Sequence, residues 1–331
     1  MATSNDTPPH DPLFAALRII AALSVAMSFG LGIYALLESA RPAAGLIGFS
    51  FLLVLPAAIS AFVAYIADPS GDRRLGTYLL VPLWLILAVI VLSATVLREG
   101  VICILILSPL WLLSGLAGAG ATYLIRKRLR RGRTYCTVLL LIPLAAIQFE
   151  PLLPLPSTIE TVTRTIVVEA PPERIWPLLR GIPDVRPGEG SWNISQDLIG
   201  VPRPIGARLI GDGEGAERIA TWGHNISFRE RITDWQEGSR LAWRFIFDDI
   251  DGWGFTDRHL MPDSPYFRVT SGGYRMMPLG PNRTRVVLDT DYWIRTPVNA
   301  YSALWGELFL GDLENNLLAL IKRRAERPVV P

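Results

Sequence analysis

Glu230 is the residue whose chemistry stands out first in this sequence. If residues 225–236 form a β-strand, Glu230 shares one face with Ile226, Phe228 and Ile232, because side chains alternate between faces with a period of two. A carboxyl group on an apolar face loses hydration, which raises its pKa and lets it donate a proton or bind a ligand hydroxyl. Two other interpretations stay open: a neighbouring arginine pairs with it, or a shifted register places it outside.

Aromatic side chains dominate the corresponding face of the neighbouring segments. The same alternation groups Trp243, Phe245 and Phe247 on one segment, and Leu288 and Tyr292 on another. Such a face either fills a core or lines a cavity for an apolar small molecule. The candidate ligand-binding residues are Phe228, Glu230, Trp243, Phe245, Phe247, Leu288 and Tyr292.

Motifs for a metal, a cofactor or a phosphate are not found. The acidic run DDIDGWG lacks the spacing of a calcium loop. His224 and His259 stand apart with no cysteine nearby, so they do not indicate zinc. GDGEG (211–215) reads as a hairpin turn, because no helix start follows it. We therefore expect neither a metal nor a cofactor.

The elements that must position these residues lie in the second half of the chain. A strand at 161–169 and a short helix at 171–180 come first, and a long helix with an apolar stripe closes the chain at 298–325. Between them lie the β-like segments RPIGARLIG, ERIATWG, NISFRERITDW, RLAWRFIF, YFRVTSGGYRMM and TRVVLDTDYWI. Strands joined by hairpins predict one antiparallel sheet, and the amphipathic helix is expected to cover its apolar face.

Three of these segments resemble a known family. TRTIVVEAPPERIWPLL resembles the opening of the START-like superfamily, also called SRPBCC and including the polyketide cyclases, whose usual form is an apolar strand followed by APxExVWxxL. FRERITDWQEGSRLAWRF resembles its mid-sheet hairpin, and TRVVLDTDYW with the helix after it resembles its ending. The resemblance covers residues 161–326 and implies an α+β helix-grip domain, in which a curved antiparallel sheet wraps a long C-terminal helix. It implies a hydrophobic or amphipathic ligand and no particular reaction.

The first half of the chain has the composition of a membrane domain. Residues 1–149 hold 11 Lys/Arg and 6 Asp/Glu, against 21 and 24 in residues 150–331. Nearly uncharged runs lie at 13–37, 43–67, 77–97, 101–125 and 135–149. The first four can each cross a hydrocarbon core of about 30 Å as a helix. The fifth is at the lower edge of that length, and the alternative for it is a re-entrant or interfacial segment.

These runs predict the domain organisation and its orientation. We expect an all-α transmembrane helix bundle of about five helices at 1–150, a Pro-rich linker at 151–160, the START-like domain at 161–326 and a tail at 327–331. The loop RKRLRRGR carries six basic residues and is expected in the cytoplasm. In a bacterial cytoplasmic membrane, five spans then place the N-terminus on the cytoplasmic side and the C-terminal domain in the periplasm. Four spans would keep the C-terminal domain in the cytoplasm.

Taken together, these features predict a membrane-anchored START-like domain that binds a hydrophobic or lipid-like small molecule. The alternatives are a cyclase- or dehydratase-type enzyme, with Glu230 and Tyr292 as candidate catalytic residues, or an interaction module without a ligand. The expected partners are the lipid bilayer and the apolar ligand. Nucleic acid is excluded because neither half of the chain carries a basic face of the required size.

Overall fold

The computed structural model describes residues 12–40, 45–93, 95, 101–128, 137–248, 253 and 261–327. The chain divides into two compact units, with the main boundary between Pro154 and Leu155.

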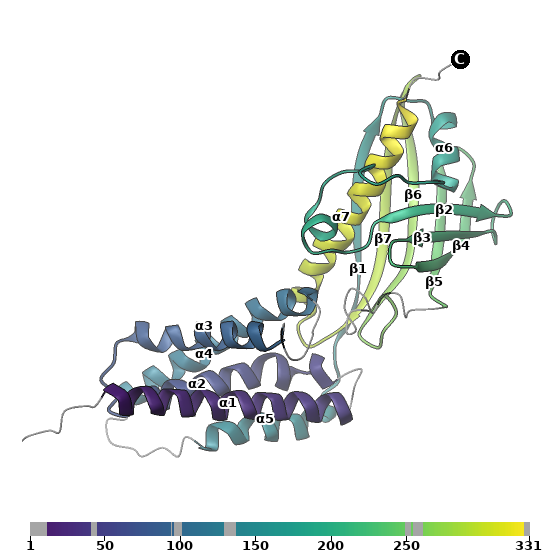
Figure 1. The fold of residues 1–331 in the computed structure, drawn as a ribbon. Helices are drawn as coiled ribbons and strands as arrows, with labels where there is room; N and C mark the ends of the chain where they lie inside the picture. The colour runs from purple at the N-terminus through teal and green to yellow at the C-terminus, as the bar shows by residue number, and fades with distance from the viewer. Residues whose placement is uncertain are drawn as a thin grey trace, which may run out of the picture. The chain divides into compact units, whose positions relative to one another are not determined.

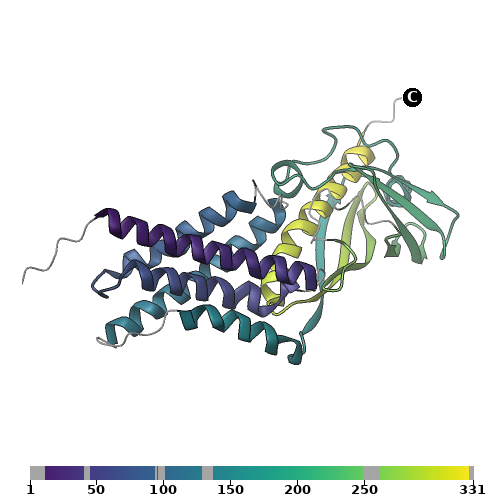
Figure 2. The same cartoon turned by 60° about the horizontal axis from the view of Figure 1, so that its bottom comes forward.

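The first unit consists of apolar helices that lie alongside one another (Figures 1 and 2). They are α1 (Pro12–Ala40), α2 (Leu55–Ala67) with the π-helical turn η2 (Ser50–Val54) before it, α3 (Leu75–Leu92), α4 (Val101–Arg128) and α5 (Thr137–Phe149). Among the described residues, four spans are long and apolar enough to cross a membrane, and α5 is an apolar helix below that length. The second and third spans cover Ser50–Ala67 and Leu75–Leu92, and the ends of the corresponding sequence runs 43–67 and 77–97 lie partly outside the described residues.

Two contacts mark the opposite ends of this helical unit. Near the end of α4, the Arg126 guanidinium donates to the carbonyl oxygen of Pro69, just after α2, at 2.6 Å. Just after α5, the Glu150 carboxylate accepts from the backbone N–H of Ser50, at the start of η2, at 3.2 Å. Because η2 and α2 run from the Ser50 end to the Pro69 end, α5 finishes at the end opposite Arg126.

The second unit contains a seven-stranded antiparallel sheet in the order β1-β7-β6-β5-β4-β3-β2 (Figure 1). Its elements are β1 (Ser157–Val168), α6 (Pro172–Arg180), the π-helical turn η5 (Ile194–Leu198), β2 (Pro204–Ile210), β3 (Glu217–Trp222), β4 (Ile226–Gln236), β5 (Arg240–Ile246), β6 (Phe267–Gly280), β7 (Arg283–Arg295) and α7 (Asn299–Ala325). The strand β1 takes in the last four residues of the expected linker at 151–160. A short 3₁₀ turn occupies Glu150–Leu152, and β1 begins at Ser157 because its first residue already pairs with Arg295 of β7.

The helix α7 lies across the inner face of the sheet, along β1 and β7 (Figures 1 and 2). Glycines allow this close approach, because a methyl group at Gly306 would clash with the Tyr292 ring and one at Gly311 would clash with Arg164. The main core forms where the apolar stripe of α7, including Leu318 and Ile321, meets the inward side chains of the strands and of α6. This arrangement is the helix-grip fold that the resemblance implied.

Candidate functional site

The seven side chains expected to bind a ligand all lie on the buried, inner side of the sheet. Phe228 and Glu230 come from β4, Trp243 and Phe245 from β5, and Phe247 follows β5 directly. Leu288 and Tyr292 come from β7 and are 1% exposed. The period-two alternation therefore identified the inward positions correctly, because the antiparallel strands keep it locally.

The structure brings three of these residues into one aromatic cluster and adds two more. Phe228 is at its centre, with ring centroids 5.8 Å from Phe245, 5.6 Å from Phe247 and 6.2 Å from both Trp222 and Trp253. Phe228 and Trp222 are buried, whereas Phe245, Phe247 and Trp253 are only partly buried. The aromatic cluster, defined as these five residues, therefore extends from the core to the surface of the unit.

Leu288 and Tyr292 lie apart from the aromatic cluster. Leu288 packs in the main core with Trp243, while Tyr292 packs with Val162 and Ile294 beneath α7. The Tyr292 hydroxyl donates to the carbonyl oxygen of Ala303 at 3.4 Å, and burial raises the pKa of Tyr292 to about 12. A phenol with this pKa stays protonated at neutral pH and does not act as a base there.

Glu230 has a partner that the sequence reading did not assign, Arg218 on β3. The strand register places the two residues directly opposite each other, each about 5% exposed, and their side chains form an ion pair. Arg218 also donates to the carbonyl oxygen of Leu179, and its guanidinium lies 4.2 Å from the ring centroid of Trp243. Burial alone would lower the pKa of Arg218, but the Glu230 carboxylate holds it above its ordinary value. The ion pair is the arginine pairing that the sequence had left open as an alternative for Glu230.

Glu314 on α7 is a buried carboxyl group of the second unit that has no ion-pair partner among the described residues. Its side chain lies inside the fold, with the residue 2% exposed, and neither carboxyl oxygen has a hydrogen-bond partner of normal geometry. Burial raises the pKa of Glu314 to about 8, although the nearby Thr290 side chain acts in the opposite direction. At neutral pH this group is therefore mainly a neutral carboxylic acid, which can both donate and accept a hydrogen bond.

The surroundings of Glu314 contain further polar groups on the inner face. Tyr274 on β6 is 4% exposed; burial raises its pKa, while the Arg218 guanidinium acts in the opposite direction. Its ring lies 5.2 Å from that of Trp243 and 5.8 Å from the Arg218 guanidinium. The inner face thus combines a carboxylic acid, a phenol and an ion pair with the aromatic cluster. The sequence signal for Glu314 was its place among Leu310, Leu317 and Ile321, at helical spacing on the apolar stripe.

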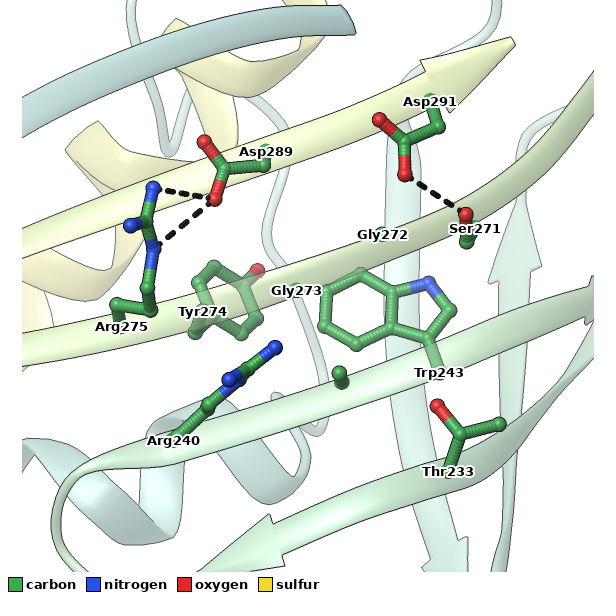
Figure 3. Close-up of a pocket in the computed structure, with 11 residues that line it drawn as sticks. Thr233, Arg240, Trp243, Ser271, Gly272, Gly273, Tyr274, Arg275, Asp289 and Asp291 are labelled. Carbon is green, nitrogen blue, oxygen red and sulfur yellow. Dashed lines mark hydrogen bonds and ion pairs between the residues drawn. The ribbon is translucent and has the colours of Figure 1, made fainter. Parts of the chain in front are cut away.

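A pocket of about 240 Å³ lies on the opposite, outer face of the sheet (Figure 3). Gly272, Gly273 and Trp243 are among its lining residues. The charged groups around it are already paired: Arg275 with Asp289, Arg240 with Asp234, and Asp291 with Ser271 and Thr161. Each of these charged groups therefore already has a partner within the protein, and only Asp291 is held by hydroxyl groups rather than by a cation.

Metal-binding geometry is not found in the part of the chain that the structure describes, where no three His, Cys, Asp or Glu side chains cluster to hold an ion. Within the DDIDGWG run only Asp248 and Trp253 lie among the described residues. His259 also lies outside them.

Comparison with known proteins gives a likeness in fold. No family model matches the sequence, and no curated protein matches it. An aromatase/cyclase from a Streptomyces species is 18% identical and has a TM-score of 0.33, with 51% of this chain and 96% of that one covered. A truncated norcoclaurine synthase from Thalictrum flavum is 15% identical at a TM-score of 0.31, with 52% and 97% covered.

A START superfamily protein from Mycobacterium smegmatis is 14% identical at a TM-score of 0.32, with 50% and 97% covered. These likenesses concern the C-terminal half of the chain. Similarities at these identities and TM-scores do not indicate a substrate or a reaction for this chain. The order of strands and the position of α7 give the second unit a helix-grip fold.

Proposed function

We propose that this protein is a membrane-anchored START-like domain that binds a hydrophobic or lipid-like small molecule on the inner face of its sheet. The observation that carries the proposal is the aromatic cluster, whose rings Phe245, Phe247 and Trp253 remain partly exposed. An apolar ligand that covers them gains about 25 cal/mol for each Å² removed from water. The four long apolar helices of the first unit support an anchor that holds the site near membrane lipids.

Glu314 gives this proposed site a polar group. A ligand with a hydroxyl or carbonyl group can hydrogen-bond to the neutral carboxyl, whose oxygens have no partner of normal hydrogen-bond geometry among the described residues. The ligand favoured by this combination is amphipathic, with an apolar body against the aromatic cluster and a polar group at Glu314.

An enzyme of the cyclase or dehydratase type is the second candidate, and Glu314 is the residue that favours it. A carboxyl with a pKa of about 8 is suited to act as a general acid near neutral pH. Glu230, the original candidate, is less suited to this role because Arg218 holds its carboxylate in an ion pair. Turnover of the bound compound that is lost in Glu314→Gln, while binding remains, would establish the enzyme.

The test of the binding proposal is mass spectrometry of small molecules that co-purify with the full chain in mild detergent. We expect an apolar compound with the wild type and an altered amount or spectrum with Phe245→Ala. Trp293→Ala is the matched control, because Trp293 is an aromatic residue on the outer side of β7. Because Phe245 is partly exposed, its loss should cost less than the roughly 3–5 kcal/mol of a fully packed ring. A large loss of stability in Phe245→Ala, with no compound bound to either protein, would instead indicate a structural module.

The proposed orientation places the C-terminal unit outside a bacterial cytoplasmic membrane. The basic loop RKRLRRGR favours the cytoplasm, and α5 ends at the end of the helical unit opposite Arg126. An alkaline phosphatase fused to the C-terminus should therefore be active in a bacterial host. An inactive phosphatase together with a fluorescent C-terminal GFP fusion would show that the C-terminal unit is cytoplasmic.

A further inference from the structure

The covalent chain fixes where the start of α7 must lie if the apolar helices are in a membrane. The last apolar helical segment ends at Leu152. Four residues later, the carbonyl oxygen of Pro156 accepts a hydrogen bond of 2.9 Å from the Asn299 side chain in the first turn of α7. Four residues span at most about 14 Å. The first turn of α7 therefore lies within reach of the headgroup region on the side where the chain leaves the bilayer.

Large apolar side chains are exposed at this same end of the second unit. Leu304, in the second turn of α7, is 69% exposed, and Ile159, near the start of β1, is 68% exposed. Tyr301 and Trp305 flank Leu304 on α7, with their ring centroids 6.3 Å apart. Aromatic side chains with a polar atom at one end are enriched where a bilayer meets water.

A cation accompanies these apolar groups. Arg295 ends β7 opposite Ser157, and its side chain is exposed. Among the described residues it makes no ion pair or side-chain hydrogen bond, unlike Arg275 on the neighbouring strand, which pairs with Asp289. An unpaired arginine near a bilayer is attracted to anionic headgroups.

We propose that Ile159, Arg295, Tyr301, Leu304 and Trp305 form an interfacial edge that inserts into the boundary between lipid headgroups and acyl chains. The inference rests on the proposed membrane anchoring of the first unit. The occupant is lipid rather than a protein partner, because the tether from Leu152 brings this end to the bilayer in every molecule. The interfacial edge would hold the C-terminal unit in a fixed orientation on the membrane.

A matched control exists on the same unit. Leu198 in η5 is 74% exposed, slightly more than Leu304. Its neighbour Ser195 donates to the Asp312 carboxylate at 2.7 Å, which places η5 beside α7 eight residues beyond Leu304. Eight helical residues correspond to about 12 Å along the axis. A side chain with equal exposure but further from the tether should not reach the acyl chains.

The experiment measures lipid contact at single cysteines in the full chain. Cys103 and Cys136 are replaced by alanine, and Leu304→Cys, Leu198→Cys and Leu141→Cys are labelled separately with an environment-sensitive fluorophore. The proteins are reconstituted into vesicles of phosphatidylcholine and phosphatidylglycerol that contain a doxyl-labelled lipid. Leu141 of α5 is 58% exposed and reports on the anchor.

We expect the doxyl lipid to quench the label at 304 several-fold more than the label at 198, with a blue-shifted emission at 304. Replacing Arg295 by Glu should reduce the quenching at 304 in vesicles with phosphatidylglycerol. Equal quenching at 304 and 198, with strong quenching at 141, would overturn the interfacial edge and leave the proposed ligand binding untouched. Absence of quenching at 141 would overturn the membrane anchor and the interfacial edge together.

Discussion

Replacing Glu314 by glutamine should remove a pH-dependent loss of stability from the second unit. Glu314 is 2% exposed, and burial raises its pKa from the ordinary 4.5 to about 8. The folded protein therefore holds the proton at pH values where the unfolded chain has released it. Glutamine has nearly the same shape and cannot ionise, so it keeps the neutral form at every pH.

The direction and the magnitude of this change in stability with pH follow from proton linkage. Below pH 4.5 the carboxyl is protonated in both states and has no pH-dependent effect. As the pH rises from 4.5 to about 8, only the unfolded state releases the proton, so the stability falls. The full loss is about 5 kcal/mol, and the part between pH 6 and pH 8.5 is about 2.5 kcal/mol. For a unit of this size, 2.5 kcal/mol corresponds to roughly 5–10 °C in Tm.

The assay is thermal unfolding of the full chain in detergent, followed at pH 6 and pH 8.5 for the wild type and for Glu314→Gln. The difference between the two proteins isolates Glu314, because all other titrating groups are common to both. We expect the Tm of the wild type to fall by several degrees more than the Tm of the variant when the pH rises from 6 to 8.5. Equal losses would show that Glu314 is not held protonated, and would remove it as a neutral hydrogen-bonding group for a ligand.

Further predictions concern packing and domain independence. Gly306→Ala should destabilise the second unit by about 1–3 kcal/mol, because the added methyl group clashes with the Tyr292 ring. Gly32→Ala, whose methyl group meets no atom within 4 Å, should not destabilise; equal Tm losses in the two variants would refute the close approach. Residues 157–331 alone should give a soluble protein with a cooperative thermal transition, because they contain every strand of the sheet and α7. A soluble product that melts without cooperativity would show that the domain boundary is misplaced.

The sequence alone was sufficient for the order of the main elements in the second unit and for the inward face of the three strands β4, β5 and β7. Both depend on local information. A β-strand alternates its side chains whatever its neighbours are, so Phe228, Trp243 and Leu288 could be placed inside before any pairing was known. The ends of the strands depend on pairing with other strands. The strand β1 begins at Ser157 because its pairing with β7 extends it beyond the apolar core of the segment.

Contacts between strands and with the helix were decided only by the tertiary structure. Arg218 occupies an inward position on β3 by the same alternation, yet its pairing with Glu230 depends on the register between β3 and β4, and a one-residue slip would separate them. The burial of Glu314 depends on how α7 is rotated on the sheet, since an apolar stripe more than 100° wide does not specify its centre. Local sequence thus determined which side chains face inward, while long-range packing determined which of them are paired, which is left without a partner, and therefore where chemistry can occur.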